Sequence, residues 1–173
     1  MAHFVLTTRV RWFSAKKIHI DRWIPEESCE AYIPVCSDVS CGSEGTLACV
    51  AYSVAGEKDT NFQAAAFSVN HLKGATTEPK CRTLAEPSPH GTVHNVRING
   101  AKFNVAEIGG AAAGNIIDGY VYRSFHNGRC YELDIRIATS NSGNSDPGTV
   151  KNFDYEKVHR TLKTVLESFK FLR

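Results

Sequence analysis

Apolar and polar residues alternate on both sides of an Asn127-Gly128 pair, from Asp118 to Ala138. An Asn-Gly pair between two alternating runs is the strongest local signal for a β-hairpin with a two-residue turn. Such a turn pairs apolar side chains on one face of the hairpin: Tyr122 with Leu133 and Tyr120 with Ile135, with Tyr131 and Ile137 beside them. The other face is charged and carries Arg123 opposite Glu132, followed by Asp134 and Arg136. We expect the first face to belong to the core and the second to be a charged surface.

A second hairpin is predicted around Asn99-Gly100, in the segment from Thr92 to Ile108. Its turn pairs apolar side chains across the strands: Val96 with Phe103 and Ile98 with Ala101. Further strands are expected from Lys17 to Trp23, from Thr46 to Val54 and from Asn61 to Asn70. Three consecutive alanines make a helix the alternative for the last of these segments. The stretch from Gly109 to Gly114 (GGAAAG) is expected to be a flexible connector.

The strongest helical pattern lies near the end of the chain, from Asp154 to Phe169. Asp154 is a suitable N-cap, and apolar residues follow it at helical spacing. A short helix fits between Thr76 and Leu84, and the residues FKFL at 169–172 fit a short edge strand. Many antiparallel strands with one strong helix indicate an α+β fold, with a central antiparallel sheet of the two Asn-Gly hairpins and further strands, flanked by helices. We expect a single domain over residues 1–173, in which residues 1–45 are partly irregular and rich in cysteine.

The composition adds six cysteines and a formal net charge of only +2. So small a net charge argues against a nucleic-acid-binding protein, which usually has a concentrated basic face. An even number of cysteines without a C-x-x-C motif is typical of disulfides in an extracytoplasmic protein and not of a zinc site, with buried thiols in a cytosolic protein as the alternative. No segment is long and apolar enough for a membrane span, and the N-terminus lacks the apolar stretch of a signal peptide. We therefore expect a periplasmic or secreted protein whose exporting segment is not apparent.

The polar loop from Thr139 to Gly148 (TSNSGNSDPG) is rich in side-chain oxygens. Hard cations such as Ca²⁺ take several oxygen ligands from a flexible loop, so this loop is a candidate calcium site with Asn141, Asn144 and Asp146 as ligands. It lacks the D-x-D-x-D-G order of an EF-hand and has one carboxylate. A solvated loop that caps the following helix is the more common meaning of such a segment.

His94 and Glu107 are the candidate catalytic pair. In the register set by Asn99-Gly100, His94 lies on the apolar face opposite Val105, and Glu107 lies one step diagonal to it. A histidine oriented by a carboxylate is the usual form of a general base. A single histidine on an apolar face is more often a hydrogen-bonded core residue. The sequence contains no nucleophile elbow, P-loop, dinucleotide-binding motif or H-E-x-x-H motif.

The charged face of the first hairpin is the candidate substrate-binding surface. It is formed by Arg123, Glu132, Asp134 and Arg136, whose charges are of both signs and can pair across the strands. The common result of such a pattern is a cross-strand ion network in which each pair contributes little stability. A helix or loop above this face would instead create a polar pocket for a carboxylate or a carbonyl group.

Three segments resemble a group of small bacterial secreted proteins: TNFQAAAFSVN, YVYRSFHNGRCYELDIRIATSN and KVHRTLKTVLESFKFL. The last two form a hairpin, a helix and a closing SFKF, an ending similar to that of the PsbP-like fold of an extrinsic photosystem subunit and a Ran-binding nuclear factor. The resemblance covers Thr46 to Arg173 and implies a central antiparallel sheet between helices, an α/β/α sandwich. Through a metagenome-type hydrolase in the same group, it also implies the opening of acyl-homoserine lactones. No catalytic motif or residue role accompanies that implication.

Two functions follow from these features. The first is metal-assisted hydrolysis of a small ester or lactone, in which a cation in the 139–148 loop polarises the carbonyl and His94 with Glu107 activates water. The second is a non-catalytic extracytoplasmic domain whose charged hairpin face binds a ligand or a protein partner. Burial of His94 and Glu107 in the core would remove the first.

Overall fold

The computed structural model describes residues 45–52, 57, 59–83, 93–112 and 114–171. Within these ranges six antiparallel strands form one sheet, in the spatial order β1-β2-β6-β5-β4-β3. The strands are β1 (Thr46–Ala51), β2 (Phe62–His71), β3 (His94–Ile98), β4 (Ala101–Ala112), β5 (Asn115–His126) and β6 (Arg129–Ser140). The helices of these ranges are α2 (Glu78–Arg82), the 3₁₀ turn η3 (Ser142–Asn144) and α3 (Tyr155–Ser168). The strand predicted from Lys17 to Trp23, and residues 1–44 of the cysteine-rich segment, lie outside the described residues.

Both Asn-Gly turns are present where the sequence predicts them. Asn127 and Gly128 have φ angles of 48° and 74°, and Asn99 and Gly100 have φ angles of 46° and 85°. Positive φ at both central residues is the mark of the type I′ turn, which matches the twist of a hairpin. The predicted register is confirmed by the strand pairs Tyr122↔Leu133, Tyr120↔Ile135 and Arg123↔Glu132 in one hairpin and Val96↔Phe103 and His94↔Val105 in the other.

The stretch from Gly109 to Ala112 is not a flexible connector, and that prediction is wrong. These residues belong to β4 and pair with residues 115–118 of β5. Glycine and alanine favour strands weakly, but the cross-strand hydrogen bonds of a long hairpin override that preference. The chain reverses at Gly114, whose φ of 81° is in the region that favours glycine.

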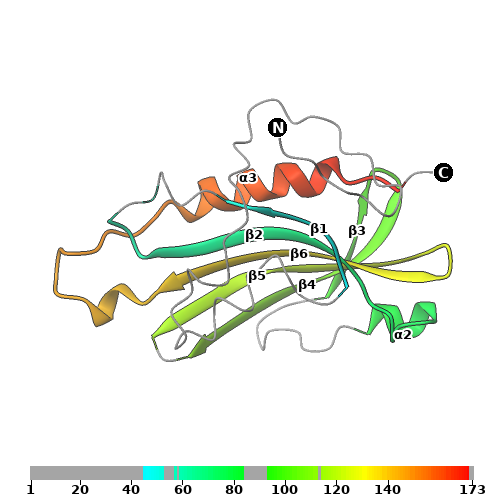
Figure 1. The fold of residues 1–173 in the computed structure, drawn as a ribbon, viewed down its shortest axis with the longest axis horizontal. Helices are drawn as coiled ribbons and strands as arrows, with labels where there is room; N and C mark the ends of the chain where they lie inside the picture. The colour runs from blue at the N-terminus through cyan, green and yellow to red at the C-terminus, as the bar shows by residue number, and fades with distance from the viewer. Residues whose placement is uncertain (1–44, 53–56, 58, 84–92, 113, 172–173) are drawn as a thin grey trace.

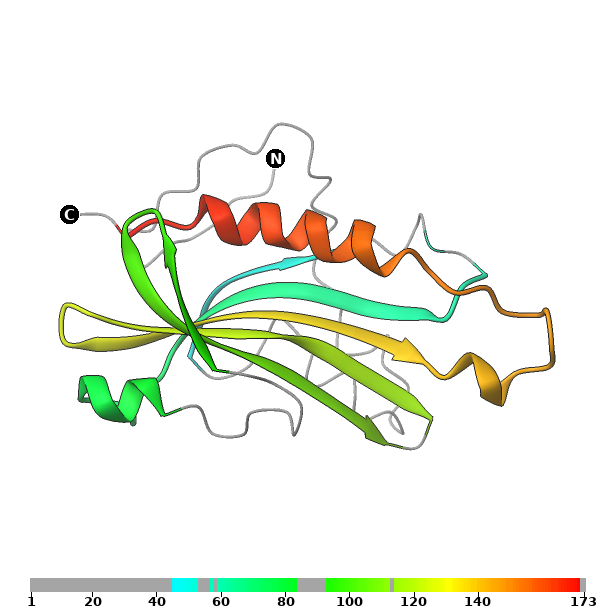
Figure 2. The same cartoon turned by 180° about the vertical axis from the view of Figure 1, so that it is seen from behind.

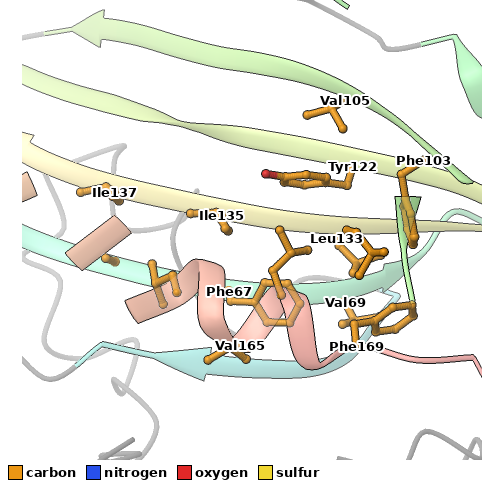
Figure 3. Close-up of a cluster of buried hydrophobic side chains, with 14 of the residues drawn as sticks. Phe67, Val69, Phe103, Val105, Tyr122, Leu133, Ile135, Ile137, Val165 and Phe169 are labelled. Carbon is orange, nitrogen blue, oxygen red and sulfur yellow. The ribbon is translucent and has the colours of Figure 1, made fainter. Parts of the chain in front are cut away.

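Helix α3 covers part of one face of the sheet. Its N-cap is Asp154, as predicted, because the Oδ1 atom of this residue accepts a hydrogen bond from the Lys157 amide at 2.9 Å. The helix buries one apolar stripe against strands β2 and β6 (Figures 1 and 3): Val158, Leu162, Val165 and Leu166. The fully buried side chains Phe67, Leu133 and Ile135 lie opposite that stripe.

The closing FKFL segment does not form the predicted edge strand, since residues 169–171 have no strand structure. Phe169 is 1% exposed and completes the core beneath the end of α3. The ring of Phe171 stacks on His126, with 4.0 Å between the ring centroids. Apolar packing of the two phenylalanines therefore replaces the strand pairing that the pattern predicts.

The prediction of an α/β/α sandwich, with helices on both faces of the sheet, is wrong. Helix α2 has five residues, about 1.4 turns, and is too short to cover a face. It lies at the ends of β5 and β6, where the Cys81–Cys130 disulfide attaches it (Figure 1). In the described residues the protein is thus a six-stranded antiparallel sheet with one long helix on one face.

Helix α3 does not reach across the whole face that it covers. It packs on β2 and β6, whereas the β3–β4 hairpin bends away from the sheet towards the C-terminal end of α3 (Figure 2). The helix-side surface of β3, β4 and β5 is therefore only partly covered. The candidate site lies in this space.

Candidate functional site

A groove of about 590 Å³ lies between α3 and strands β3, β4 and β5. Pockets for small molecules usually measure roughly 300–1,000 Å³, so this volume suits such a ligand. The apolar part of the lining comes from all four elements: Val96, Ile98, Val105, Tyr122 and Leu166. The polar part comes from the same elements and from the Asn99-Gly100 turn: His94, Arg97, Asn99, Tyr120, His159, Lys163 and Glu167.

The Asn99 side chain fixes the β3–β4 hairpin to the end of α3. Its Nδ2 atom donates hydrogen bonds to the backbone carbonyls of Glu167 at 2.8 Å and Phe169 at 2.7 Å. The last carbonyls of a helix have no partner within the helix, so this contact satisfies two polar groups and joins two elements. It closes the groove at the C-terminal end of the helix.

The floor of the groove is dry and apolar. Val105 is 1%, Leu166 2% and Tyr122 8% exposed. Figure 3 shows Val105 and Tyr122 on the side of the core away from Val165. Burial raises the pKa of the Tyr122 hydroxyl to about 12, and the charges of Tyr120 and Glu167 add to this effect. The hydroxyl is therefore protonated at neutral pH and can donate a hydrogen bond.

His159 presents a buried ring nitrogen at the groove. Its ring lies 5.3 Å from that of Tyr120 and stacks on that of Tyr155 at 5.9 Å, centroid to centroid. Within the described structure the Nε2 atom is buried without a hydrogen-bond partner. Burial lowers the pKa of His159, Glu156 opposes this effect and Lys163 adds to it. The imidazole is thus neutral at pH 7, and the His159 residue lines the groove.

A group of acidic and phenolic side chains lies beyond the other end of the groove. Burial raises the pKa of the Asp118 carboxyl, and the nearby Glu107 carboxylate raises it further. The pKa of Tyr155 is raised to about 12, by burial first and then by Asp118 and Tyr120. Acidic side chains therefore gather near the start of α3, whereas Lys163 and Glu167 stand in its last two turns.

The structure places the candidate catalytic residues on the helix-side surface but does not bring both into the groove. His94 is exposed and lines the groove opposite Val105, so it is not a core histidine. Glu107 is also exposed, pairs with Tyr120 across the strands and is not among the groove-lining residues. Their role as a general base and its orienting group stays a prediction.

The charged hairpin face is an ion network. Arg123 Nε lies 2.6 Å from Glu132 Oε2, and its Nη1 atom donates to the Thr83 carbonyl at 2.6 Å. Arg136 Nη2 lies 3.2 Å from Asp134 Oδ2. The polar pocket expected at this face needs a helix or loop above it, and the C-cap residue of α2, Thr83, contacts the face. Its backbone carbonyl, however, accepts a hydrogen bond from Arg123, the residue that would bind a substrate. Binding of a substrate by these four residues stays a prediction.

The asparagines of the oxygen-rich loop make contacts within the protein. The Oδ1 atom of Asn141 accepts a hydrogen bond from the Gly143 amide at 2.9 Å, which forms the start of η3. The Asn144 side chain packs against Gly114, where an added Cβ would lie 2.3 Å from Nδ2. Asp146 is the only carboxylate of this loop, and calcium sites usually contain several. The described ranges also contain no group of three His, Cys, Asp or Glu side chains that could hold a metal ion. Calcium binding by this loop stays a prediction.

Sequence patterns missed most of the groove. The alternation assigns Tyr120 and Tyr122 to the interior, and the helical pattern from Asp154 to Phe169 assigns no residue to a site. A usable signal was present, because Tyr155, His159, Lys163 and Glu167 recur every four residues beside the apolar stripe of the helix. Such a row marks the border between the covered and exposed parts of a helix.

The disulfide prediction is confirmed for part of the chain. Cys81 and Cys130 form a disulfide that joins α2 to β6, and Cys49 is disulfide-bonded as well. Disulfides persist in oxidising compartments, so these bonds are compatible with an extracellular location. Among the described helices none has the length and apolarity to cross a membrane.

No protein-family model matches the chain, and no curated protein sequence is detectably similar to it. The resemblance to small secreted proteins and to the PsbP-like ending therefore stays a prediction. The function is inferred from the groove alone.

Proposed function

We propose that the protein is a non-catalytic domain that binds a small, partly apolar molecule in the groove between α3 and the β3–β4 hairpin. The observation that carries this proposal is the cavity itself, which measures about 590 Å³ and has a buried apolar floor. His159 lines its wall, and the Nε2 atom of this residue has no hydrogen-bond partner within the described ranges. Ligand sites typically combine a mainly apolar surface with a few polar groups that orient the ligand.

The groove lining supports binding better than hydrolysis. No serine, threonine or cysteine is among the described residues that line it, so no aliphatic hydroxyl or thiol nucleophile accompanies His94 there. Metal-assisted hydrolysis of a lactone or ester remains a separate prediction. It requires that the protein open an acyl-homoserine lactone and that excess chelator abolish this activity, because the cation would polarise the carbonyl.

We also propose that the protein works outside the cytoplasm. The Cys81–Cys130 disulfide supports this location, because such a bond in a cytosolic protein would be exposed to reduction. A binding domain in the periplasm or secreted medium would meet small molecules from the surroundings of the cell.

A fluorescence titration of the full chain with the neutral probe N-phenyl-1-naphthylamine tests the binding proposal. The probe fluoresces strongly only in an apolar site, so saturable binding with a one-to-one stoichiometry is expected. Val96→Trp adds an indole ring to the groove wall and should weaken binding by about tenfold or more. The matched control is Val93→Trp, because Val93 is 50% exposed and does not line the groove.

Two results would contradict the proposal. One is the absence of saturable binding to the native protein. The other is unchanged probe affinity in a Val96→Trp variant whose circular dichroism and thermal midpoint match those of Val93→Trp.

A further inference from the structure

We infer that the groove selects a small amphipathic anion: an apolar or aromatic body that carries one carboxylate or sulfonate group. This inference rests on the proposed function, because it names the ligand class of the same groove. It is carried by the position of Lys163 and the His159 ring on one wall, opposite Arg97 on the other.

Lys163 is a cation without a partner at the edge of an apolar groove. Among the described residues its ammonium group forms no hydrogen bond or ion pair. Glu167 follows it by four residues, but this order of lysine before glutamate is the weaker arrangement on a helix. The ammonium group is thus free to bind an anion.

His159 places a second polar group beside Lys163. The two residues are four positions apart on α3, so their side chains lie on the same side of the helix. Burial lowers the pKa of His159, and the positive charge of the nearby Lys163 lowers it further. The His159 ring lines the groove beside this charge, and its buried Nε2 atom has no hydrogen-bond partner among the described residues.

The charges on the groove lining favour an anion over a cation. Among the lysine, arginine and acidic residues of the lining, Lys163 and Arg97 are positive and Glu167 is negative. Arg97 donates to the Gly100 carbonyl at 3.0 Å and forms no ion pair in the described part of the chain. A bound cation would be attracted by the Glu167 carboxylate and repelled by the positive charges of Lys163 and Arg97.

The size of the groove argues against a small inorganic anion as the natural occupant. A phosphate or sulfate ion would fill only a small part of its volume of about 590 Å³. Burial of apolar surface is the main source of affinity for small ligands, so the charged group needs an apolar body attached to it.

A matched pair of probes tests the inference on the full chain. The anion 8-anilinonaphthalene-1-sulfonate has the ring system of N-phenyl-1-naphthylamine with one added sulfonate. The native protein should bind the anion about tenfold more tightly than the neutral probe, since a hydrogen bond to a charged group contributes at least this factor. Lys163→Gln should abolish most of that preference and leave the affinity for the neutral probe within about twofold.

Arg160→Gln is the matched control, because it removes one positive charge from an exposed position of the same helix outside the groove. It should keep the preference for the anion. Equal affinity of the native protein for the two probes would overturn the inference and leave the groove as a binding site. So would an equal loss of both affinities in Lys163→Gln, or an equal loss of preference in Arg160→Gln. If neither probe binds, the proposed function fails as well.

Discussion

The two faces of the sheet are formed by the same strands, but one is charged and the other is apolar and covered by a helix. On β5 and β6 the apolar residues Tyr122, Leu133 and Ile135 point to one face, and Arg123 and Glu132 point to the other. The charged face pairs its own charges and is joined to α2 by a disulfide. The apolar face is buried by α3, and this single helix packs on β2 and β6 and does not extend over the whole sheet. We conclude that the site lies where the cover ends, and not where the charges are densest.

This difference explains why charge was a poor guide to the site. Arg123 is the most conspicuous polar residue of the hairpin, yet Glu132 and the Thr83 carbonyl occupy its guanidinium. Lys163 stands in an ordinary helix pattern, but it has no ion-pair partner in the part of the chain that the structure describes, and it lines the groove. A charge indicates binding only when its surroundings leave it unpaired beside an accessible volume.

The largest effect is expected from the apolar face. Phe67 is fully buried in the core beneath α3, and Phe67→Ala should lower the free energy of unfolding by about 4 kcal/mol, because it leaves a cavity that α3 cannot fill. Val93→Ala at an exposed position should change it by less than about 0.5 kcal/mol. Chemical denaturation checks both values, and equal effects of the two substitutions would show that α3 is not packed as described.

A smaller effect is expected from the charged face. The Arg123 and Glu132 side chains are 14% and 12% exposed, so Arg123→Met leaves a largely buried carboxylate without its partner. We expect the free energy of unfolding to fall by about 2 kcal/mol, less than for a fully buried pair. The double variant Arg123→Met, Glu132→Leu should recover more than half of that loss in denaturation experiments. Recovery of none of it would mean that the ion pair is not the relevant contact.

The contact between the β3–β4 hairpin and the end of α3 is tested by substitutions at the two Asn-Gly turns. Asn99→Gly keeps the positive φ of the turn but removes both hydrogen bonds to the end of α3, so it should lower the free energy of unfolding by about 1 kcal/mol. Asn127→Gly is the matched control at the other type I′ turn, away from α3. If thermal or chemical denaturation gives the same value for both variants, the Asn99 contact does not hold the groove closed.

The smallest effect is a pH dependence at the groove wall. The pKa of His159 is below its usual value of 6.5 in the folded protein, chiefly through burial. The unfolded chain therefore binds more protons as the pH falls below about 6.5, and the contribution of His159 lowers the stability of the folded state there. His159→Gln should reduce the loss of thermal stability between about pH 8 and about pH 5. An unchanged or steeper loss would contradict the buried, neutral ring.

Local patterns predicted the hairpins because each hairpin is specified by a two-residue turn and by the alternation of apolar and polar residues in its strands. Asn99-Gly100 and Asn127-Gly128 force the chain to reverse, and the alternation then assigns every side chain to a face. The helix from Asp154 followed equally from its cap and its apolar stripe. These features are decided within about twenty residues of sequence.

The remaining errors concern contacts between distant segments. Residues 109–112 join β4 because β5 pairs with them, and FKFL leaves the sheet because Phe169 and Phe171 pack elsewhere. The groove depends on how far α3 extends over the sheet and on how the β3–β4 hairpin bends towards it. No local pattern around His159 or Tyr122 contains that information.

The most direct test of the central claim is a two-dimensional ¹H–¹⁵N NMR titration of the full chain with N-phenyl-1-naphthylamine. We predict that the shifted amides belong to the groove, on β3, β4, β5 and α3, with His94, Tyr122 and His159 among the most affected. Amides around Asp134 and Arg136 on β6 should shift little, because the sheet separates them from the ligand. Shifts centred on the charged face, or no saturable shifts at all, would contradict the assignment of function to the apolar face.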